Sequence, residues 1–80
     1  MPIYRCLLIG GGQCLGGTNL DEARSRLESR MHSIAGFVAK PIRVKHKHES
    51  DKLYECYQLG EAKGVIISGY IDNPVEDFLT

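Results

Sequence analysis

The sequence has no tryptophan, only three cysteines and no net charge, and each scarcity excludes something. Three cysteines cannot all pair within one chain, so they are not the framework of a disulfide-rich scaffold. Equal numbers of acidic and basic residues give no overall field that attracts a polyanion, although a neutral total can still include a basic face. No apolar run is long enough to span a bilayer, so we expect no membrane partner.

The N-terminus shows no pattern of a secretion signal, because Met1-Pro2-Ile3-Tyr4-Arg5 leads directly into a short apolar run that ends at three glycines. We therefore expect a cytoplasmic protein in a reducing compartment, with Cys6 and Cys56 as small buried thiols. A chain of 80 residues supports one hydrophobic core. We expect a single domain over residues 1–80.

One amphipathic helix is the clearest predicted element. Apolar residues recur at three- and four-residue spacing, with charged residues between them, and form the stripe Leu20, Ala23, Leu27, Met31 and Ile34. Asn19 is suited to cap the start and Gly36 to end the helix in a left-handed conformation. The spacing therefore predicts one buried helical face with both ends marked.

Apolar or alternating segments predict strands over residues 3–9, 42–49, 53–59 and 65–71. Residues 13–15 form either a further strand in a hairpin or part of a long glycine loop, and the hairpin is slightly favoured. Pro74, followed by acidic residues, predicts a short C-terminal helical turn. The expected class is α+β: one helix on an antiparallel sheet of four or five strands, three of them after the helix.

The strand register decides which sheet face is the core. A two-residue turn at Ser50-Asp51 pairs His46 with Glu55 and His48 with Leu53, and pairs Ile42 with Leu59 and Val44 with Tyr57. A longer connection over residues 60–64 pairs Leu59 with Val65. The expected core face is then Ile42, Val44, Leu53, Tyr57, Leu59, Val65, Ile67 and Ile71.

The same register gathers a mixed set of side chains on the other face: Arg43, Lys45, Lys47, Tyr54, Cys56, Gln58, Ile66, Ser68 and Tyr70. One helix covers only one side, so this face is open unless the N-terminal strand, the tail or another molecule covers it. Tyrosines among basic and apolar residues are suited to partner binding, although an ordinary solvated face is also consistent with the pattern.

Motifs for chemistry are incomplete. The glycines around Gln13-Cys14-Leu15 lack the Gly-Lys-Ser/Thr of a phosphate loop, so a flexible hairpin tip is favoured over a nucleotide site. His46 and His48 share a face from which Cys56 points away, and no usual zinc spacing occurs. Cys14 is the only candidate nucleophile, without a visible base. We expect no cofactor, no metal and no enzyme activity.

A short strand or hairpin, then Thr18-Asn19-Leu20-Asp21-Glu22-Ala23 opening a helix, then a strand meander, resembles small standalone proteins of phages and mobile elements, among them anti-CRISPR inhibitors. The resemblance is one of architecture over the whole chain. It implies a protein that binds a large host enzyme or ribonucleoprotein, masking its nucleic-acid channel or locking its assembly.

The first functional hypothesis is a non-enzymatic protein-interaction module that binds and inhibits or modulates a larger host protein or ribonucleoprotein complex. Its expected partner-binding residues are Arg43, Lys45, Lys47, Tyr54 and Tyr70, with Arg26 and Arg30 on the charged helix surface. One alternative is binding of single-stranded nucleic acid through the basic and tyrosine-bearing face. Another is a small homodimer formed through open faces or edge strands.

Overall fold

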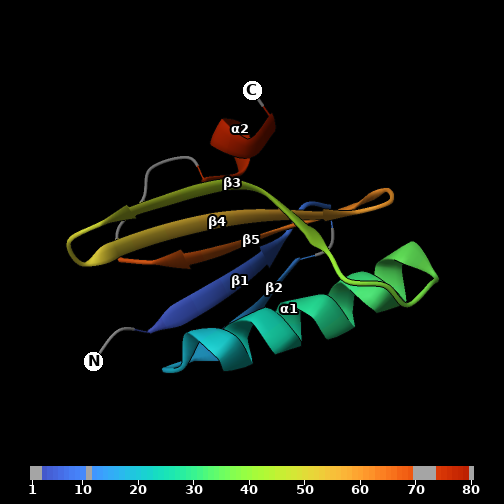
Figure 1. Ribbon diagram of the computed structural model, residues 1–80, viewed down its shortest axis with the longest axis horizontal. Coiled ribbons are helices and arrows are strands. Elements are labelled where there is room, and N and C mark those ends of the chain that lie inside the picture. The colour runs from blue at the N-terminus through green and yellow to red at the C-terminus, as the bar shows by residue number, and fades with distance from the viewer. Residues whose placement is uncertain (1–2, 11, 70–73, 80) are drawn as a thin grey trace.

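In the computed structural model, which describes residues 3–10, 12–69 and 74–79, one antiparallel sheet lies between two helices (Figure 1). Its strands are β1 (Tyr4–Leu8), β2 (Gly12–Gly17), β3 (Ile42–Glu49), β4 (Lys52–Leu59) and β5 (Ala62–Ser68). Their order in the sheet is β2-β1-β5-β4-β3. Helix α1 (Leu20–Ala35) packs on one face and α2 (Pro74–Leu79) on the other. The predicted α+β class, the element order and the β1–β2 hairpin are confirmed.

Local signals fix both ends of α1. The Asn19 side chain accepts a hydrogen bond from the backbone N–H of Glu22 at 3.1 Å, as expected of an N-cap. Gly36 adopts φ 82° and donates its N–H to the His32 carbonyl, which is the left-handed C-terminal cap that the sequence predicts. Ala23, Leu27 and Met31 of the predicted stripe are buried and Leu20 is partly buried, whereas Ile34 in the last turn is exposed.

The first core lies between α1 and the sheet and contains Cys6, Leu8, Ala23, Leu27, Met31, Leu53, Leu59, Ala62 and Ile66. Two glycines allow α1 to approach the strands closely. A Cβ at Gly16 would lie 2.9 Å from the Ala23 Cβ, and one at Gly64 would lie 2.7 Å from Leu27 Cδ1. The helix therefore packs on β2 and β5 only because these two positions have no side chain.

A second core lies on the opposite face and contains Tyr54, Cys56, Val65 and Ile67, with Leu7 and Phe78 packed against it. The Tyr54 hydroxyl donates to the Pro74 carbonyl oxygen at 2.6 Å, which ties α2 to the sheet. The face is therefore not open at its centre, because the C-terminal tail, one of the covers that the sequence left possible, packs over it. Tyr54 is buried there and is not a surface residue.

The predicted register between β4 and β5 is also wrong. The connection is the tight turn Gly60-Glu61, so that Leu59 pairs with Ala62 and not with Val65. This difference of three residues turns every β5 side chain to the other face, since side chains alternate along a strand. Val65 and Ile67 consequently belong to the second core, and Ile66 to the first. Tyr70 and Ile71 lie outside the described residues.

Strand β3 contains an irregularity between Arg43 and Lys45 that the sequence reasoning did not include. The pairs His46–Glu55 and His48–Leu53 are as predicted, but Ile42 lies opposite Gln58 and Arg43 opposite Tyr57. Val44 is an extra residue in the strand, so the side chains before it point to the opposite face of the sheet from the one predicted. Arg43 therefore lies on the α1 side of the sheet and not on the face predicted for it. Ile42 and Val44, expected in the core, are exposed.

Candidate functional site

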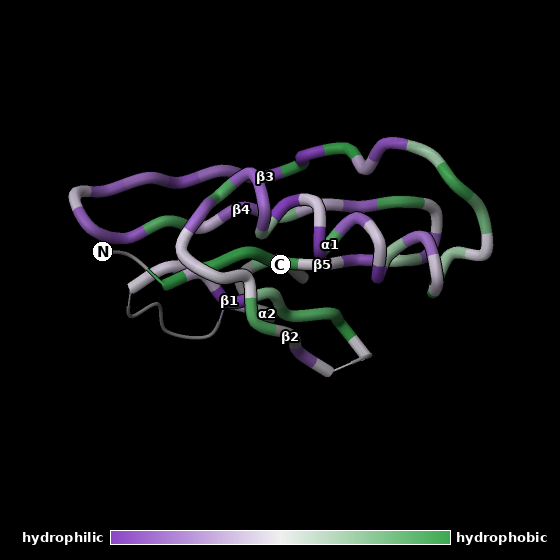
Figure 2. Tube along the Cα trace, turned by 90° about the horizontal axis from the view of Figure 1, so that it is seen from below, coloured by the Kyte–Doolittle hydropathy of each residue, from purple (hydrophilic) through white to green (hydrophobic). Residues whose placement is uncertain are grey.

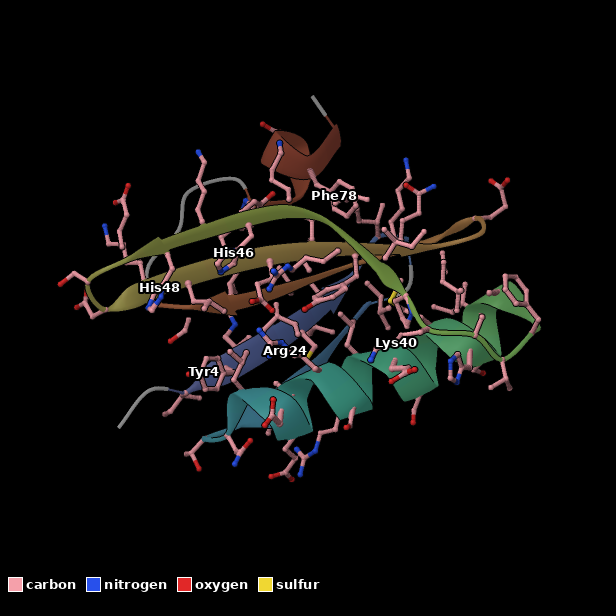
Figure 3. All side chains as sticks on the ribbon, viewed as in Figure 1. Tyr4, Arg24, Lys40, His46, His48 and Phe78 are labelled. Carbon is pink, nitrogen blue, oxygen red and sulfur yellow. The ribbon has the colours of Figure 1, made fainter. Side chains whose placement is uncertain are left out.

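Within the described part of the chain, α1 leaves open a surface on its own side of the sheet. Helix α1 packs mainly on β2, β5 and β1 and barely reaches β4, so the half of this face over β4 and β3 is uncovered. The space between α1 and β3, here called the α1–β3 groove, contains a cavity of about 620 Å³ and a second of about 550 Å³. Arg24 and Arg43 line both. Figure 3 shows Arg24 and His46 pointing into this space.

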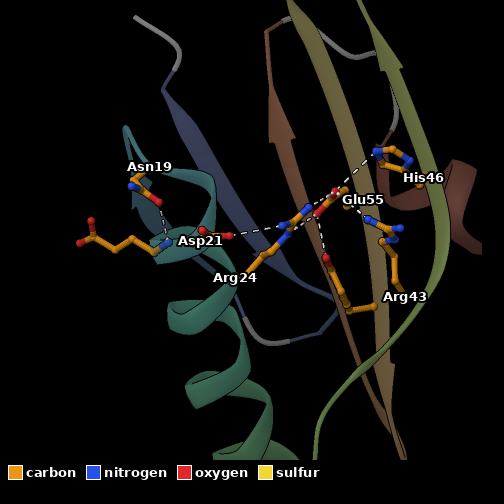
Figure 4. Close-up of polar contacts among 8 residues, drawn as sticks. Asn19, Asp21, Arg24, Arg43, His46 and Glu55 are labelled. Atoms are coloured by element: carbon orange, nitrogen blue, oxygen red, sulfur yellow. Dashed lines mark hydrogen bonds and ion pairs between the residues drawn. The ribbon is translucent and has the colours of Figure 1, made fainter.

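Glu55 forms the floor of the groove and is fully buried, with a relative exposure of 0%. Arg24 donates to it through Nε at 3.1 Å and Nη2 at 2.7 Å, and Tyr57 donates its hydroxyl at 2.8 Å. Arg43 Nη1 lies 3.4 Å and His46 Nε2 3.5 Å from the same carboxylate (Figure 4). One buried negative charge is thus surrounded by two guanidinium groups, a hydroxyl and an imidazole.

These contacts shift the pKa values of Glu55 and Arg24 in the directions that keep both groups charged. Burial raises the pKa of Glu55, but the hydrogen bonds from Arg24 and Tyr57 and the positive charges of Arg24 and Arg43 outweigh it, so the net shift is downward. The hydrogen bond to Glu55 raises the pKa of Arg24 against the effect of burial. Burial and the hydrogen bond to Glu55 raise the pKa of Tyr57. The carboxylate is a structural anchor for α1, β3 and β4.

The metal-ligand candidates His46, His48 and Cys56 do not converge. His46 lies on the Glu55 side of β3, and Cys56 pairs with Lys45 and faces the second core, as the sequence indicated. Among the residues that the structure describes, no group of three His, Cys, Asp or Glu side chains is placed to hold a metal ion. The Cys14 side chain is outside the described part.

Besides Arg43 and Tyr54, the predicted partner-binding residues that the structure describes fall in two places. Lys45 and Lys47 lie opposite Cys56 and Tyr54, so they are on the α2 side of β3, where they were expected. Arg26 is exposed on α1, pairs with Glu22 and donates to the Leu15 carbonyl, and Arg30 is exposed on the same helix. The structure therefore does not bring the two groups onto one surface.

Residues that follow one another between the end of α1 and the first half of β3 expose large apolar side chains. This 34–44 segment contains Ile34, Phe37, Val38, Ile42 and Val44, of which Val38 is 83% and Ile42 is 68% exposed. The segment is held in place, because His32 Nε2 lies 2.6 Å from the Ala39 carbonyl oxygen that accepts its hydrogen bond. The Phe37 ring lies over Gly60, where a Cβ would come within 3.1 Å of it.

Sequence reasoning placed Glu55 beside His46 as an ion-pair or hydrogen-bond partner, which the structure shows at 3.5 Å, but it identified neither the arginines around Glu55 nor the exposed 34–44 segment. A signal for the Glu55 cluster was present: a carboxylate at a core-facing position between Leu53 and Tyr57 requires a cationic partner. Arg24, one residue from the buried stripe of α1, was available to be that partner. The exposed 34–44 segment carried no such signal, because Ile42 and Val44 fit the alternation of a half-buried strand.

Comparison with protein-family models, curated proteins and solved structures found no match to this chain. Within the described ranges, neither helix combines the length and hydrophobicity needed to cross a bilayer. Function is therefore inferred from the surface chemistry of the chain itself.

Proposed function

We propose that this chain is a non-enzymatic interaction module of the cytoplasm that binds a larger protein or ribonucleoprotein complex and inhibits or modulates it. The observation that carries the proposal is the exposed apolar 34–44 segment. Large apolar side chains that a small protein leaves exposed along one short stretch of chain commonly mark a place where a partner binds. The architectural resemblance to anti-CRISPR inhibitors supports a partner of this size.

The surroundings of the segment support a protein partner. The segment runs directly into β3, which is hydrophilic along most of its length (Figure 2). Protein interfaces commonly combine an apolar centre with a charged and polar rim. The 34–44 segment supplies the first, and the basic residues of β3 supply the second.

Affinity capture with surface variants tests the proposal. The tagged chain is used to isolate its partner from the native host, beside the double variant Val38→Ser, Ile42→Thr and the control Leu15→Thr. Leu15 is 72% exposed in β2, at the far edge of the sheet, so the control removes a comparable apolar side chain elsewhere. We expect the double variant to lose the partner and the control to retain it. Equal retention by both variants, or equal loss, would contradict the proposal.

Binding of single-stranded nucleic acid is the second candidate. Its phosphates would contact the basic residues of β3, of which Lys45 and Lys47 lie on one side of the strand and Arg43 on the other. Such binding would weaken steeply with salt, since phosphate contacts release counterions. Titration of a labelled oligonucleotide with the protein at about 20 mM and about 200 mM salt measures how the affinity depends on salt concentration. No binding at the lower salt concentration would exclude nucleic-acid binding.

The homodimer is a separate alternative. Light scattering of the chain alone tests it, because a monomer mass would contradict a homodimer.

A further inference from the structure

Among the residues that the structure describes, no strand pairs with the outer edge of β3, which is here called its free edge. Strand β3 is the last strand of the sheet and spans Ile42–Glu49, a length sufficient for pairing with another chain. Seven of its eight residues are exposed, and within the described ranges none of them belongs to either hydrophobic core. Along an edge strand, the backbone N–H and C=O groups that point away from the sheet are available to an additional strand.

The charge along this edge is one-sided. Arg43, His46 and His48 lie on the α1 side of β3, and Lys45 and Lys47 lie on the α2 side. Glu49, at the end of the strand, is its only acidic residue. The strand thus carries three positive charges against one negative charge, beside two histidines.

This charge decides which strand the edge accepts. Lysines on an edge strand commonly prevent pairing between copies, because like charges then face each other across the new ladder. A second β3 is therefore a poor occupant, and an uncharged strand gains nothing from the five basic side chains. A strand with carboxylates at alternating positions places them beside basic residues, at the roughly 5 Å spacing of cross-strand neighbours.

We infer that the free edge of β3 binds an extended acidic segment of a partner protein by strand addition; this inference rests on the proposed function, because it assumes that the partner is a protein. On the α1 side, carboxylates of the added strand face the larger cavity of the groove. Arg43 is half exposed there and reaches Glu55 only through a long 3.4 Å contact of Nη1, so its guanidinium retains donors for a second carboxylate.

A nucleic-acid strand fits this edge less well. Single-stranded nucleic acid is commonly bound by stacking of bases on exposed aromatic rings. Tyr54 is buried beneath α2, and the Tyr57 hydroxyl is bonded to Glu55 on the groove floor. Main-chain hydrogen bonds along an edge strand select a peptide, whose own backbone provides the matching groups.

Amide hydrogen exchange of the full chain tests the inference. The probe is a blocked eight-residue peptide of alternating glutamate and threonine, and the control peptide has lysine in place of glutamate. We expect the acidic peptide to slow exchange of the fast amides of residues 42–49 by about tenfold or more at saturation, because pairing removes them from solvent. The lysine peptide should leave them unchanged. Absence of binding by the acidic peptide, or binding without protection of β3, would overturn the inference.

A charge-matched pair of variants separates strand recognition from attraction by bulk charge. The variant Lys47→Glu changes an exposed cation of β3, whereas Arg30→Glu changes an exposed cation elsewhere by the same charge. We expect only the first, shown to be folded by its dispersed amide spectrum, to lose about tenfold or more in affinity. Equal losses would contradict the inference. If a captured partner depends on Val38 and Ile42 but leaves the β3 amides unprotected, the proposed function stands and strand addition fails.

Discussion

Arg24 on α1 holds both carboxylate oxygens of Glu55 on β4, with Nε 3.1 Å from Oε1 and Nη2 2.7 Å from Oε2. This bidentate pair connects the helix to the part of the sheet that α1 does not cover. It also fixes the position of the groove floor, because Tyr57 and Arg43 converge on the same carboxylate. The pair links the stability of the fold to the shape of the open surface.

Replacing Arg24 should destabilise the protein strongly. Arg24→Ala removes two of the hydrogen bonds to a fully buried carboxylate, and we expect a loss of about 3 kcal/mol in the free energy of unfolding. Denaturant titration measures this loss. The matched control Arg30→Ala changes an exposed arginine of the same helix and should alter stability by less than about 0.5 kcal/mol. Similar losses in both variants would show that Glu55 does not depend on Arg24.

The lowered pKa of Glu55 predicts how stability depends on pH. The folded pKa lies below the unfolded value, which is about 4.3 for glutamate. The stabilisation is therefore complete above the unfolded pKa and is lost as the pH falls through the folded pKa. We expect the stability difference between the wild-type chain and Glu55→Gln to narrow between about pH 5 and pH 3. A difference that stays constant over this range would contradict the assignment.

The close approach of α1 to β2 predicts a coupled pair of substitutions. Gly16→Ala brings a methyl group within 3 Å of the Ala23 Cβ, and we expect it to cost about 1 to 3 kcal/mol. Ala23→Gly alone should cost about 1 kcal/mol through lower helix propensity. The double variant should lose less stability than the sum of the two single losses, because Ala23→Gly removes the contact with Ala23 and leaves only those with the Tyr4 carbonyl oxygen and Cβ, at 3.0 and 3.1 Å. Simple additivity would mean that the helix can move away from β2.

Helix α2 should protect the second core. Phe78→Ala removes the α2 side chain that packs against the cluster containing Cys56, so the Cys56 thiol should become accessible through local opening. In a Cys14→Ser background, we expect Cys56 to react about tenfold or more faster with a thiol reagent, and Cys6 in the first core to stay slow. Ile34→Ala is the matched control, since Ile34 is exposed on α1. Equal acceleration of both thiols would indicate global destabilisation.

The elements with local signals were predictable from the sequence. Asn19 and Gly36 determine the ends of α1 through interactions within a few residues, and the Ser50-Asp51 turn fixes its adjoining pairs by loop length alone. The register of β5 was not predictable in this way. Val65-Ile66-Ile67 is continuously apolar, so either register buries a large side chain on the core face, and only the presence of α2 explains why both faces are apolar.

Two physical reasons explain why Arg43 was predicted on the wrong side of the sheet and why the α1–β3 groove was not predicted. The irregularity at Val44 moves Arg43 to the α1 side of the sheet, and a bulge depends on the paired strand as well as on its own sequence. The position of α1 across β2, β1 and β5 leaves β3 uncovered, and this placement depends on the glycine contacts at Gly16 and Gly64. These long-range relationships have no local pattern in the chain.

The most direct test of the account is hydrogen exchange on the complex with the captured partner, compared with the free chain. We predict slower exchange across residues 34–49, which join the exposed apolar segment to the edge strand, with little change in β2 at the other edge of the sheet. Protection confined to β2 or to the outer surface of α1, with residues 34–49 unchanged, would contradict the account.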